Sequence, residues 1–368
     1  MSLVCPVLTY PLALLIQGVF RIFEMACGIN ERLPAHMVNI GKPQKWQMFI
    51  FLAALLIIII LKKILALPVR WIVTLAAVWL LIWRPARGMT LTFLDVGQGD
   101  GIYVEAPDGS RFLIDGGSSS VSSVGEYRLL PFLRYQGTRE LAAVFVTHPD
   151  TDHCNGVKEI LEQNVTGDVR IRCLVLPDID KGAQNDGYRD LELTAVQNRV
   201  PVAYISRGQK LEKGGVSFTC LHPVKGERTK DANAYSVVLG LTYENFSALL
   251  TGDLEAEGEK ELLDYLNDLN TKKEMEKEEK MISNLTVLKA AHHGSSYSTP
   301  TELLELLSPY YTVISCGKNN SYGHPHRELL KRLSDCGTDV MITYETGAVT
   351  FKTDGRNLWL SIFLQEQR

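Results

Sequence analysis

The sequence predicts an α/β domain that follows a membrane region, and three patterns support this prediction. Residues 1–90 hold nearly continuous apolar runs, whereas the remaining residues alternate short strand-like and helical segments. The formal charge changes at the same place, from nine Lys/Arg against two Asp/Glu in residues 1–90 to 29 against 40 in residues 91–368. Acidic and histidine side chains, finally, follow several of the predicted strands. The chain therefore combines a basic, apolar region with an acidic globular domain.

Charge and cysteine content narrow the possible function classes. The net charge of −11 over residues 91–368, which is 29 minus 40, is unlike the basic surface of a tight nucleic-acid binder. The seven cysteines are scattered and never form a C-x-x-C pair, so they indicate neither a disulfide framework nor a zinc knuckle.

The membrane region, residues 1–88, is expected to contain a helical hairpin at about 48–83. This run of 36 mostly apolar residues is interrupted by two short polar breaks, and a membrane-spanning helix needs about 20 apolar residues. Residues 6–27 are more amphipathic and either span the membrane or lie along its surface. The sequence therefore predicts transmembrane helices ahead of the globular domain, in a multi-pass protein of the cell membrane.

The globular domain, residues 89–368, is expected to mix strands and helices. Alternation and turn residues predict strands at residues 90–95, 102–106, 111–114, 141–146, near 174, 202 and 216, and at 235–241, 247–250, 286–290 and 312–315. Helices are predicted at residues 156–162, 301–307 and 326–334. The charge run at residues 267–281 is expected to form a solvated helical insertion.

One short segment, H-P-D-T-D-H at residues 148–153, carries the chemistry. It places two histidines and two aspartates directly after a predicted buried strand. Side chains two positions apart share a face in an extended segment, so His148, Asp150 and Asp152 can converge while His153 turns inward at a helix start. Two carboxylates this close repel each other unless a cation lies between them. The alternative, that the aspartates cap a helix, accounts for one aspartate and not for the set.

Four other groups follow predicted strands and extend this pattern. They are Asp95, Asp115, Asp253 and the pair His292-His293. Sites of α/β folds gather at the carboxyl ends of strands, so we expect these side chains to meet the H-P-D-T-D-H segment. The sequence therefore predicts a metal centre with two divalent ions.

Six sequence blocks resemble the C-terminal, metallo-β-lactamase-fold domain of ComEC-type DNA-internalisation (competence) proteins. They are F-L-D-V-G-Q-G-D, L-I-D-G-G, H-P-D-x-D-H-x-x-G, L-L-T-G-D, L-K-A-A-H-H-G-S and Y-G-H-P-H, in this order over residues 90–368. The resemblance implies an αββα sandwich. The apolar N-terminus is similar to the end of that family's membrane region, so we expect a truncated or split member of the family.

The resemblance also implies roles for individual residues. His148 and Asp150 would hold one ion, Asp152 and His153 the second, and Asp253 would bridge the two. From the H-H-G-S block, His293 would be a ligand, and His292 either its alternate or a group that faces the substrate. The residues expected to take part in catalysis are Asp152, His292 and His326. The residues expected to support the ligands are Asp95, Asp115, Asn233, Ser236 and His324.

The expected ligand set favours manganese. Asp150 replaces an imidazole, and the segment N-A-Y-S at 233–236 stands where many relatives of this fold have a metal-binding histidine. The first site is therefore rich in oxygen, which suits Mn²⁺ or Mg²⁺ better than nitrogen or sulfur ligands would. We expect two divalent ions, Mn²⁺ by preference, with Zn²⁺ as the alternative.

The resemblance implies a membrane-anchored, metal-dependent phosphodiester hydrolase, a nuclease that degrades DNA strands, single strands above all, during DNA uptake. It further implies other membrane subunits of a competence channel as partners, and a position on the outer face of the membrane. Basic and aromatic side chains at Tyr127, Arg128, Arg134, Tyr135 and Arg139 are candidate contacts for phosphates and bases. Two alternatives stay open: an esterase of the same fold for a small or cell-wall-linked phosphodiester, and a tethered metal-binding module without turnover.

Overall fold

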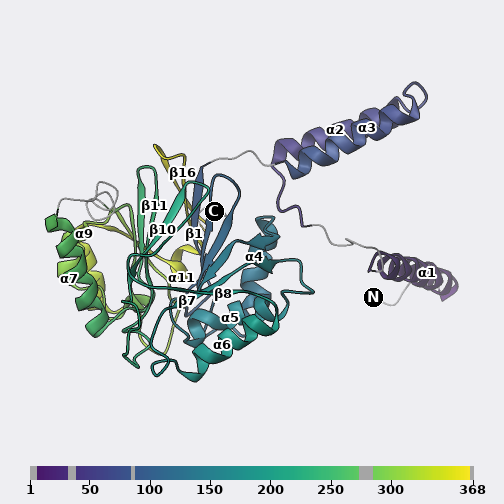
Figure 1. Ribbon diagram of the computed structural model, residues 1–368. Helices are drawn as coiled ribbons and strands as arrows, with labels where there is room; N and C mark the ends of the chain where they lie inside the picture. Colours follow the sequence, from purple (N-terminus) through teal and green to yellow (C-terminus); the bar gives the residue numbers. More distant parts are fainter. Residues whose placement is uncertain (1–5, 32–38, 84–87, 273–284, 365–368) are drawn as a thin grey trace. The chain divides into compact units, whose positions relative to one another are not determined.

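The computed structural model describes residues 6–31, 39–83, 88–272 and 285–364 (Figure 1). The chain divides into two compact units, Met1–Asn39 and Ile40–Arg368. Within the first unit, the described residues form a single helix, α1 (Pro6–Glu31). The second unit contains a pair of helices and the strands of the globular domain.

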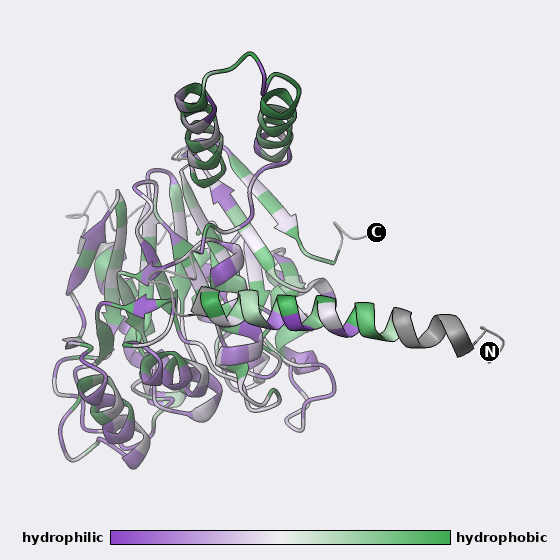
Figure 2. Ribbon diagram, turned by 90° about the vertical axis from the view of Figure 1, so that its right-hand side faces the viewer, coloured by the Kyte–Doolittle hydropathy of each residue, from purple (hydrophilic) through white to green (hydrophobic). Residues whose placement is uncertain are grey.

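The pair of helices, α2 (Lys45–Ile60) and α3 (Leu67–Ile82), forms a hairpin. The buried Gln47 side chain joins them, because its Nε2 donates to the carbonyl oxygens of Leu80 (2.7 Å) and Trp83 (2.8 Å). Figure 2 shows apolar residues along both helices. Among the helices of the described segments, none is both long enough and apolar enough to cross a membrane. The prediction of transmembrane helices ahead of the globular domain is therefore not supported.

Two β-sheets form the globular domain. The eight-stranded sheet has the order β17-β16-β1-β2-β3-β5-β7-β8, with β1 (Met89–Phe93), β2 (Ile102–Glu105), β3 (Arg111–Ile114), β5 (Ala143–Phe145), β7 (Leu174–Pro177), β8 (Val202–Ile205), β16 (Val349–Thr353) and β17 (Leu358–Ile362). The seven-stranded sheet has the order β15-β14-β13-β12-β11-β10-β9, with β9 (Lys210–Lys213), β10 (Val216–His222), β11 (Val238–Tyr243), β12 (Phe246–Leu250), β13 (Val287–Lys289), β14 (Tyr311–Ile314) and β15 (Asp339–Ile342). A separate short pair joins β4 (Glu140–Leu141) to β6 (Arg170–Ile171).

The two sheets pack face to face around an apolar core. Phe112 and Phe145 of one sheet meet Phe218 of the other, with ring centroids 4.8 Å and 5.3 Å apart, in the range of favourable aromatic pairs. Strands buried on both faces do not alternate: β5 is apolar throughout, and β12 is fully buried with Ser247 as its one polar residue.

Helices cover the outer face of each sheet (Figure 1). On the eight-stranded sheet these are a π-helical turn (Gly125–Leu129), α4 (Leu130–Tyr135), α5 (Thr151–Glu162) and α6 (Asp186–Gln197). On the seven-stranded sheet they are α7 (Ala256–Lys272), α9 (Thr301–Leu307) and α10 (Arg327–Cys336); the short α11 (Thr343–Thr346) follows β15. The αββα sandwich that the sequence predicts is thus confirmed. Of the predicted charged insertion at 267–281, residues 267–272 belong to α7, and residues 273–281 lie outside the described residues.

The strand directions bring distant loops to one edge of the sandwich. β3 and β5 run parallel in one sheet, and β12, β13 and β14 run parallel in the other. The loops that follow these strands therefore emerge at carboxyl ends, where sites of α/β folds gather. The loops after β3, β5, β12 and β13 carry, in this order, Asp115, the H-P-D-T-D-H segment, Asp253 and the H-H-G-S turn. The loop after β14 leads to His324.

Candidate metal centre

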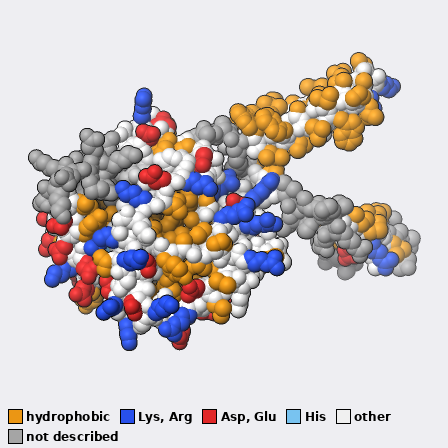
Figure 3. Space-filling model, in the orientation of Figure 1, with side chains coloured by type: hydrophobic (Ala, Val, Ile, Leu, Met, Phe, Trp, Pro, Cys, Tyr) orange, Lys and Arg blue, Asp and Glu red, His pale blue; other side chains and the backbone are white. Residues whose placement is uncertain are grey.

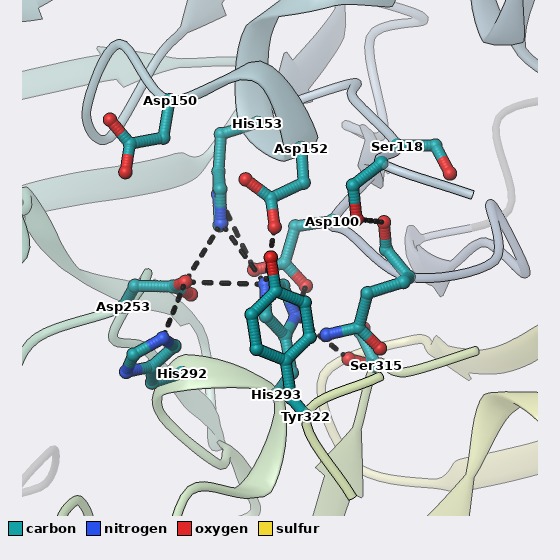
Figure 4. Close-up of polar contacts among 12 residues, drawn as sticks. Asp100, Ser118, Asp150, Asp152, His153, Asp253, His292, His293, Ser315 and Tyr322 are labelled. Carbon is teal, nitrogen blue, oxygen red and sulfur yellow. Dashed lines mark hydrogen bonds and ion pairs between the residues drawn. The ribbon is translucent and has the colours of Figure 1, made fainter. Parts of the chain in front are cut away.

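Four buried side chains from four loops meet at this edge (Figure 4). Asp100, His153, Asp253 and His293 each offer one ligand atom, and these atoms all lie within 4.8 Å of one another. Asp152 adjoins the group, with a carboxylate oxygen 3.5 Å from His293 Nε2. Such a concentration of carboxylates and imidazoles in a small volume is the usual make-up of a metal site.

The H-P-D-T-D-H segment supplies His153 and the adjoining Asp152 through the start of α5. Asp150 is the N-cap residue of α5, yet its side chain makes no capping hydrogen bond, so capping does not account for it. His153 lies in the first turn and is fully buried. Gly117 lets this turn approach, because a Cβ there would lie 2.4 Å from the carbonyl carbon of Asp152.

The opposite half comes from two tight turns of the seven-stranded sheet. In T-G-D, Gly252 has a φ of +53°, and a Cβ there would lie 2.2 Å from Ser236 Oγ, so only glycine fits. In the H-H-G-S turn, His292 and His293 both have left-handed backbone angles, with φ of +48° and +53°. Non-glycine residues adopt this region at a cost, and such strain gathers at functional sites.

The hydrogen bonds of the two innermost histidines show how they would bind an ion. Nδ1 of His153 lies 2.9 Å from an Asp115 carboxylate oxygen, and Nδ1 of His293 lies 2.9 Å from the carbonyl oxygen of Ser315. Both Nδ1 atoms are therefore donors, so Nε2 is the atom of each ring that offers a lone pair once the ring is neutral. These two Nε2 atoms lie 3.3 Å apart, and at 3.1 Å and 3.2 Å from one oxygen of Asp253. A cation fits this arrangement, since every inward-facing atom is an electron-pair donor.

A second, looser group of ligands lies beside the first. The rings of His148 and His153 are 4.1 Å apart, and His148 Nε2 lies 3.9 Å from an Asp150 carboxylate oxygen. His148 Nε2 and Asp253 Oδ1 are buried and have no hydrogen-bond partner in the described part of the chain. Buried polar atoms are rarely left without a partner, so both atoms fit a role as ligands. The geometry thus has room for two ions that share Asp253.

Asp100 and Lys289, two charged residues that the sequence analysis missed, lie at the base of the centre. Nζ of Lys289, the last residue of β13, is 2.7 Å from a carboxylate oxygen of Asp100 and donates to the carbonyl oxygens of Gly252 (2.9 Å) and Ala290 (3.2 Å). Both charged residues are fully buried. A signal existed in the sequence, because a lysine inside the apolar run T-V-L-K-A-A is expected to have a buried partner.

The formal charges of the centre also fit two divalent ions. Five carboxylates carry −5, and Lys289 carries +1, so the sum is −4; the carboxylates are those of Asp100, Asp115, Asp150, Asp152 and Asp253. Two divalent cations would bring this sum to zero. Buried charge is costly unless it is compensated, so the number of carboxylates favours two ions over one.

The pKa values of the ligands follow from burial and mutual charge. Burial lowers the pKa of His293, but Asp253 and the hydrogen bond to Asp152 outweigh it and raise that pKa to about 10. Burial likewise lowers the pKa of His153, and Asp253 and Asp115 raise it well above the ordinary value. Burial and the neighbouring His153 hold the pKa of His148 well below its usual range. An ion entering the inner group would therefore displace protons from His153 and His293.

The other predicted residues divide into those that reach the centre and those that do not. Asp115 and Ser236 support it: Asp115 accepts from His153, and Ser236 Oγ lies 3.4 Å from His148 Nδ1 and accepts from the backbone N of Asp253 (3.1 Å). In the described chain, neither a hydrogen bond nor an ion pair joins Asp95 or Asn233 to a ligand directly, although the carbonyl oxygen of Asn233 accepts from the backbone N of Ser236 (3.1 Å). The supporting role of these two residues stays a prediction. The Asp95 carboxylate accepts from Gly97 N (3.2 Å), and the loop continues to bring in Asp100 instead.

The two histidines of Y-G-H-P-H make different contacts, and their predicted roles stay predictions. The ring of His324 lies 5.5 Å from His292 and 6.4 Å from His293. His326 begins α10, and its Nδ1 accepts from the backbone N of Ser296 (2.8 Å). The geometry therefore places His324 beside the centre, and His326, expected to be catalytic, holds the loop.

The outer histidine of the H-H-G-S turn has its own carboxylate partner. His292 Nδ1 lies 2.6 Å from Glu255, and its Nε2 lies 3.8 Å from Asp253. Burial lowers the pKa of His292, but the hydrogen bond to Glu255 and the charge of Asp253 raise it above the usual value. This half-buried imidazole fits the expected place of a group that faces the substrate.

Comparison with known proteins identifies the family. Residues 94–318 match the model of the metallo-beta-lactamase superfamily. The chain is 32% identical over 284 residues to ComE operon protein 3 of Bacillus subtilis, which covers 73% of this chain and 34% of that protein. It is 28% identical over 257 residues to Recombination protein 2 of Haemophilus influenzae (70% and 28%), and 26% identical over 268 residues to Competence protein ComA of Neisseria gonorrhoeae (73% and 33%).

These matches confirm the family resemblance of the sequence blocks. The chain spans about a third of the length of the curated relatives it matches. The metal centre described above lies within the matched residues. The chain therefore belongs to the metallo-beta-lactamase superfamily, as a hydrolase related to the competence proteins.

Proposed function

We propose that this protein hydrolyses phosphodiester bonds of DNA strands in a metal-dependent reaction that accompanies DNA uptake. The observation that carries the proposal is the pair of ligand groups on either side of Asp253, one formed by Asp152, His153 and His293 and the other by His148 and Asp150. Two divalent ions sharing a carboxylate are suited to phosphodiester displacement. Similarity to a protein named for competence favours DNA as the substrate.

Two divalent cations, Mn²⁺ by preference, would activate water and offset the charge of the phosphodiester. His153 and His293 would bind through Nε2, because Asp115 and Ser315 fix Nδ1 as the donor of each ring. Glu255 orients His292 through Nδ1 and, together with Asp253, favours the doubly protonated imidazole, so that the Nε2–H group faces the centre and can give its proton to the leaving oxygen. The preference for Mn²⁺ rests on the oxygen ligands Asp150, Asp152 and Asp253.

Part of the expected DNA-contact surface is used by the fold itself. Arg134 makes two hydrogen bonds of 2.9 Å to Asp168, and the hydroxyl of Tyr135 accepts from Lys42 (2.7 Å). Tyr127 and Arg128 are exposed. We therefore keep Tyr127 and Arg128, together with the exposed Arg139, as proposed contacts for a DNA strand.

We also propose that the hairpin α2–α3 attaches the chain to the cell membrane, with the hydrolase domain on the outer face and other subunits of a competence channel as partners. Large apolar side chains stay exposed along both helices; among them are Phe49, Leu52, Ile60, Trp71, Ile72, Leu75 and Trp79. Figure 3 shows hydrophobic side chains along the hairpin, with Lys or Arg side chains at its tip. Exposed apolar patches of this size mark partner or membrane surfaces. Co-flotation with anionic liposomes, lost in Trp71→Ser/Trp79→Ser, tests the attachment.

The nuclease proposal is tested with the full-length chain, stripped of metal and reloaded with Mn²⁺, Zn²⁺ or Mg²⁺. End-labelled single- and double-stranded DNA would be compared with a bis-aryl phosphodiester. We expect Mn²⁺-dependent cleavage of DNA that is lost in Asp152→Asn and kept in Asp186→Asn, which changes an exposed aspartate in the first turn of α6. Cleavage of the small ester alone would assign the esterase function instead. Metal binding without any turnover would leave a non-catalytic module.

A further inference from the structure

A column of aromatic rings leads from the metal centre to the surface. The rings of His293 and His324 have centroids 6.4 Å apart and planes inclined by 33°. The ring of Tyr322 stacks on His324 at 5.6 Å with an angle of 24°. Tyr322 is 57% exposed, and Figure 4 shows it in front of the centre. A metal-binding imidazole is thus connected, ring by ring, to an exposed phenol.

One amide side chain, that of Asn320, holds the backbone that carries the two outer rings of this column. Asn320 Nδ2 donates to the carbonyl oxygens of Gly317 (2.9 Å) and His324 (2.6 Å). Its Oδ1 accepts from the backbone N of Tyr322 (3.1 Å) and of His324 (3.0 Å). Exposed loop aromatics are ordinarily free to reorient, but four hydrogen bonds to one side chain hold this loop in a single shape. The backbone positions from which the two rings project are therefore set before any ligand arrives.

The far end of the loop is tied to the turn that carries the metal ligands. The backbone N of His326 donates to the carbonyl oxygen of Gly294 (2.9 Å), and His326 Nδ1 accepts from Ser296 N (2.8 Å). The position of the Tyr322–His324 ring pair relative to His293 is therefore set by backbone contacts of the H-H-G-S turn. A ligand held at the metal centre would therefore lie at a fixed distance from this ring pair.

The loop also has the charge that a polyanion requires. Residues 315–326, between β14 and α10, contain Lys318 and no acidic residue, and α10 begins with Arg327 followed by Glu328, whereas residues 91–368 carry −11 as a whole. Both basic side chains are exposed. Surfaces that bind single-stranded nucleic acids combine basic side chains along the backbone with aromatic rings on which bases stack.

We propose that Tyr322, backed by His324, is the stacking platform for the nucleobase adjoining the phosphodiester held at the metal centre. This inference rests on the proposed nuclease function and gives it a substrate class, a strand with an unpaired base beside the cleaved bond. A base inside a duplex has both of its faces covered, so the platform selects single strands.

The test compares two oligonucleotides of equal length and charge, one with thymine at every position and one with tetrahydrofuran abasic units. The Mn²⁺-loaded full chain is assayed for kcat and KM, beside Tyr322→Leu and Tyr322→Phe. Tyr310→Leu is the matched control, since Tyr310 is 60% exposed and precedes β14 at the opposite end of that strand. Binding of the same oligonucleotides is measured by fluorescence anisotropy in the Asp152→Asn background, which gives a readout apart from turnover.

We expect Tyr322→Leu to weaken binding of the thymine strand about tenfold, within the range of about 5- to 150-fold that base stacking contributes. Its KM for the thymine strand should rise by the same factor, while kcat stays unchanged. The KM and the binding affinity for the abasic strand should also stay unchanged. Tyr322→Phe, which keeps the ring, and Tyr310→Leu should behave as wild type. Equal losses on both strands, or none on either, would overturn the platform while leaving the nuclease in place. If the wild-type chain cleaves neither strand, the proposed function itself fails, and the platform with it.

Discussion

The two ligand groups that share Asp253 differ in how firmly the chain holds them. His153 and His293 are fully buried, and each is fixed through Nδ1 by a partner at 2.9 Å. On the other side, the Asp150 side chain is 49% exposed, and its carboxylate lies 3.9 Å from His148. Preorganised ligands lose little entropy on binding an ion, whereas mobile ones must be ordered first. The comparison teaches that the two ions of one centre should differ in affinity, the inner one being held more tightly.

Removing the shared carboxylate should have the largest effect, because both ions depend on it. We expect Asp253→Asn to lose both ions and all turnover, and Asp150→Asn to lose only the weaker ion. Metal content after dialysis, measured by plasma mass spectrometry, separates the two outcomes. Equal loss in the two variants would mean that the groups do not differ in affinity.

The next test measures how the buried Lys289 contributes to the free energy of unfolding. Lys289→Met leaves Asp100 buried without its partner, and breaking a buried pair in this way costs about 3–5 kcal/mol. Lys289→Met/Asp100→Asn removes both charges and should regain much of that free energy of unfolding in urea. The control is Lys158→Met at the surface pair with Asp190, where about 0–1 kcal/mol is expected. An unrecovered double variant would show that the ion pair is not the reason for the loss.

The smallest effect concerns the support behind the H-H-G-S turn. Glu259 of α7 accepts from the backbone N of Thr299 (2.5 Å), and burial raises its pKa from 4.5 to about 8. Because this pKa is raised on folding, the carboxyl group contributes stability below about pH 4.5 that is lost as the pH rises through about 8.

Glu259→Gln keeps the acceptor and removes this titration. We expect the Tm advantage of this variant over wild type to be several degrees larger at pH 8.5 than at pH 5. Glu257→Gln, at an exposed position of the same helix, should show no such pH dependence. A constant difference between Glu259→Gln and wild type across this range would exclude the titration of Glu259 as its cause.

The residues that the sequence reveals are those close together in the chain. The H-P-D-T-D-H segment and the H-H-G-S turn each bring their ligands within a few residues, so their spacing alone predicts a metal centre. Lys289 and Asp100 are 189 positions apart, and only the folded chain shows that they pair. Asp95 and Asp100 both follow β1, and alternation cannot tell which carboxylate turns inward.

The apolar N-terminal region shows a different limit of the sequence pattern. Hydropathy over 48–83 correctly places two helices, but α2 and α3 are each 16 residues long. The break around Lys62-Lys63 and the proline at the start of α3 shorten both helices below the length that a membrane span needs. A count of apolar residues does not show where a helix ends.

Lys289 has a consequence for the order of events when this protein matures. A centre whose positive charges were all metal ions would have to gather its carboxylates around ions already present. Here one cation is part of the chain, bonded to Asp100 and to the carbonyl oxygen that precedes Asp253. The domain can fold around Lys289 first, and the ions can enter later from the side where Asp150 is exposed to solvent. This lysine therefore offsets one of the five carboxylates before any metal ion has entered the centre.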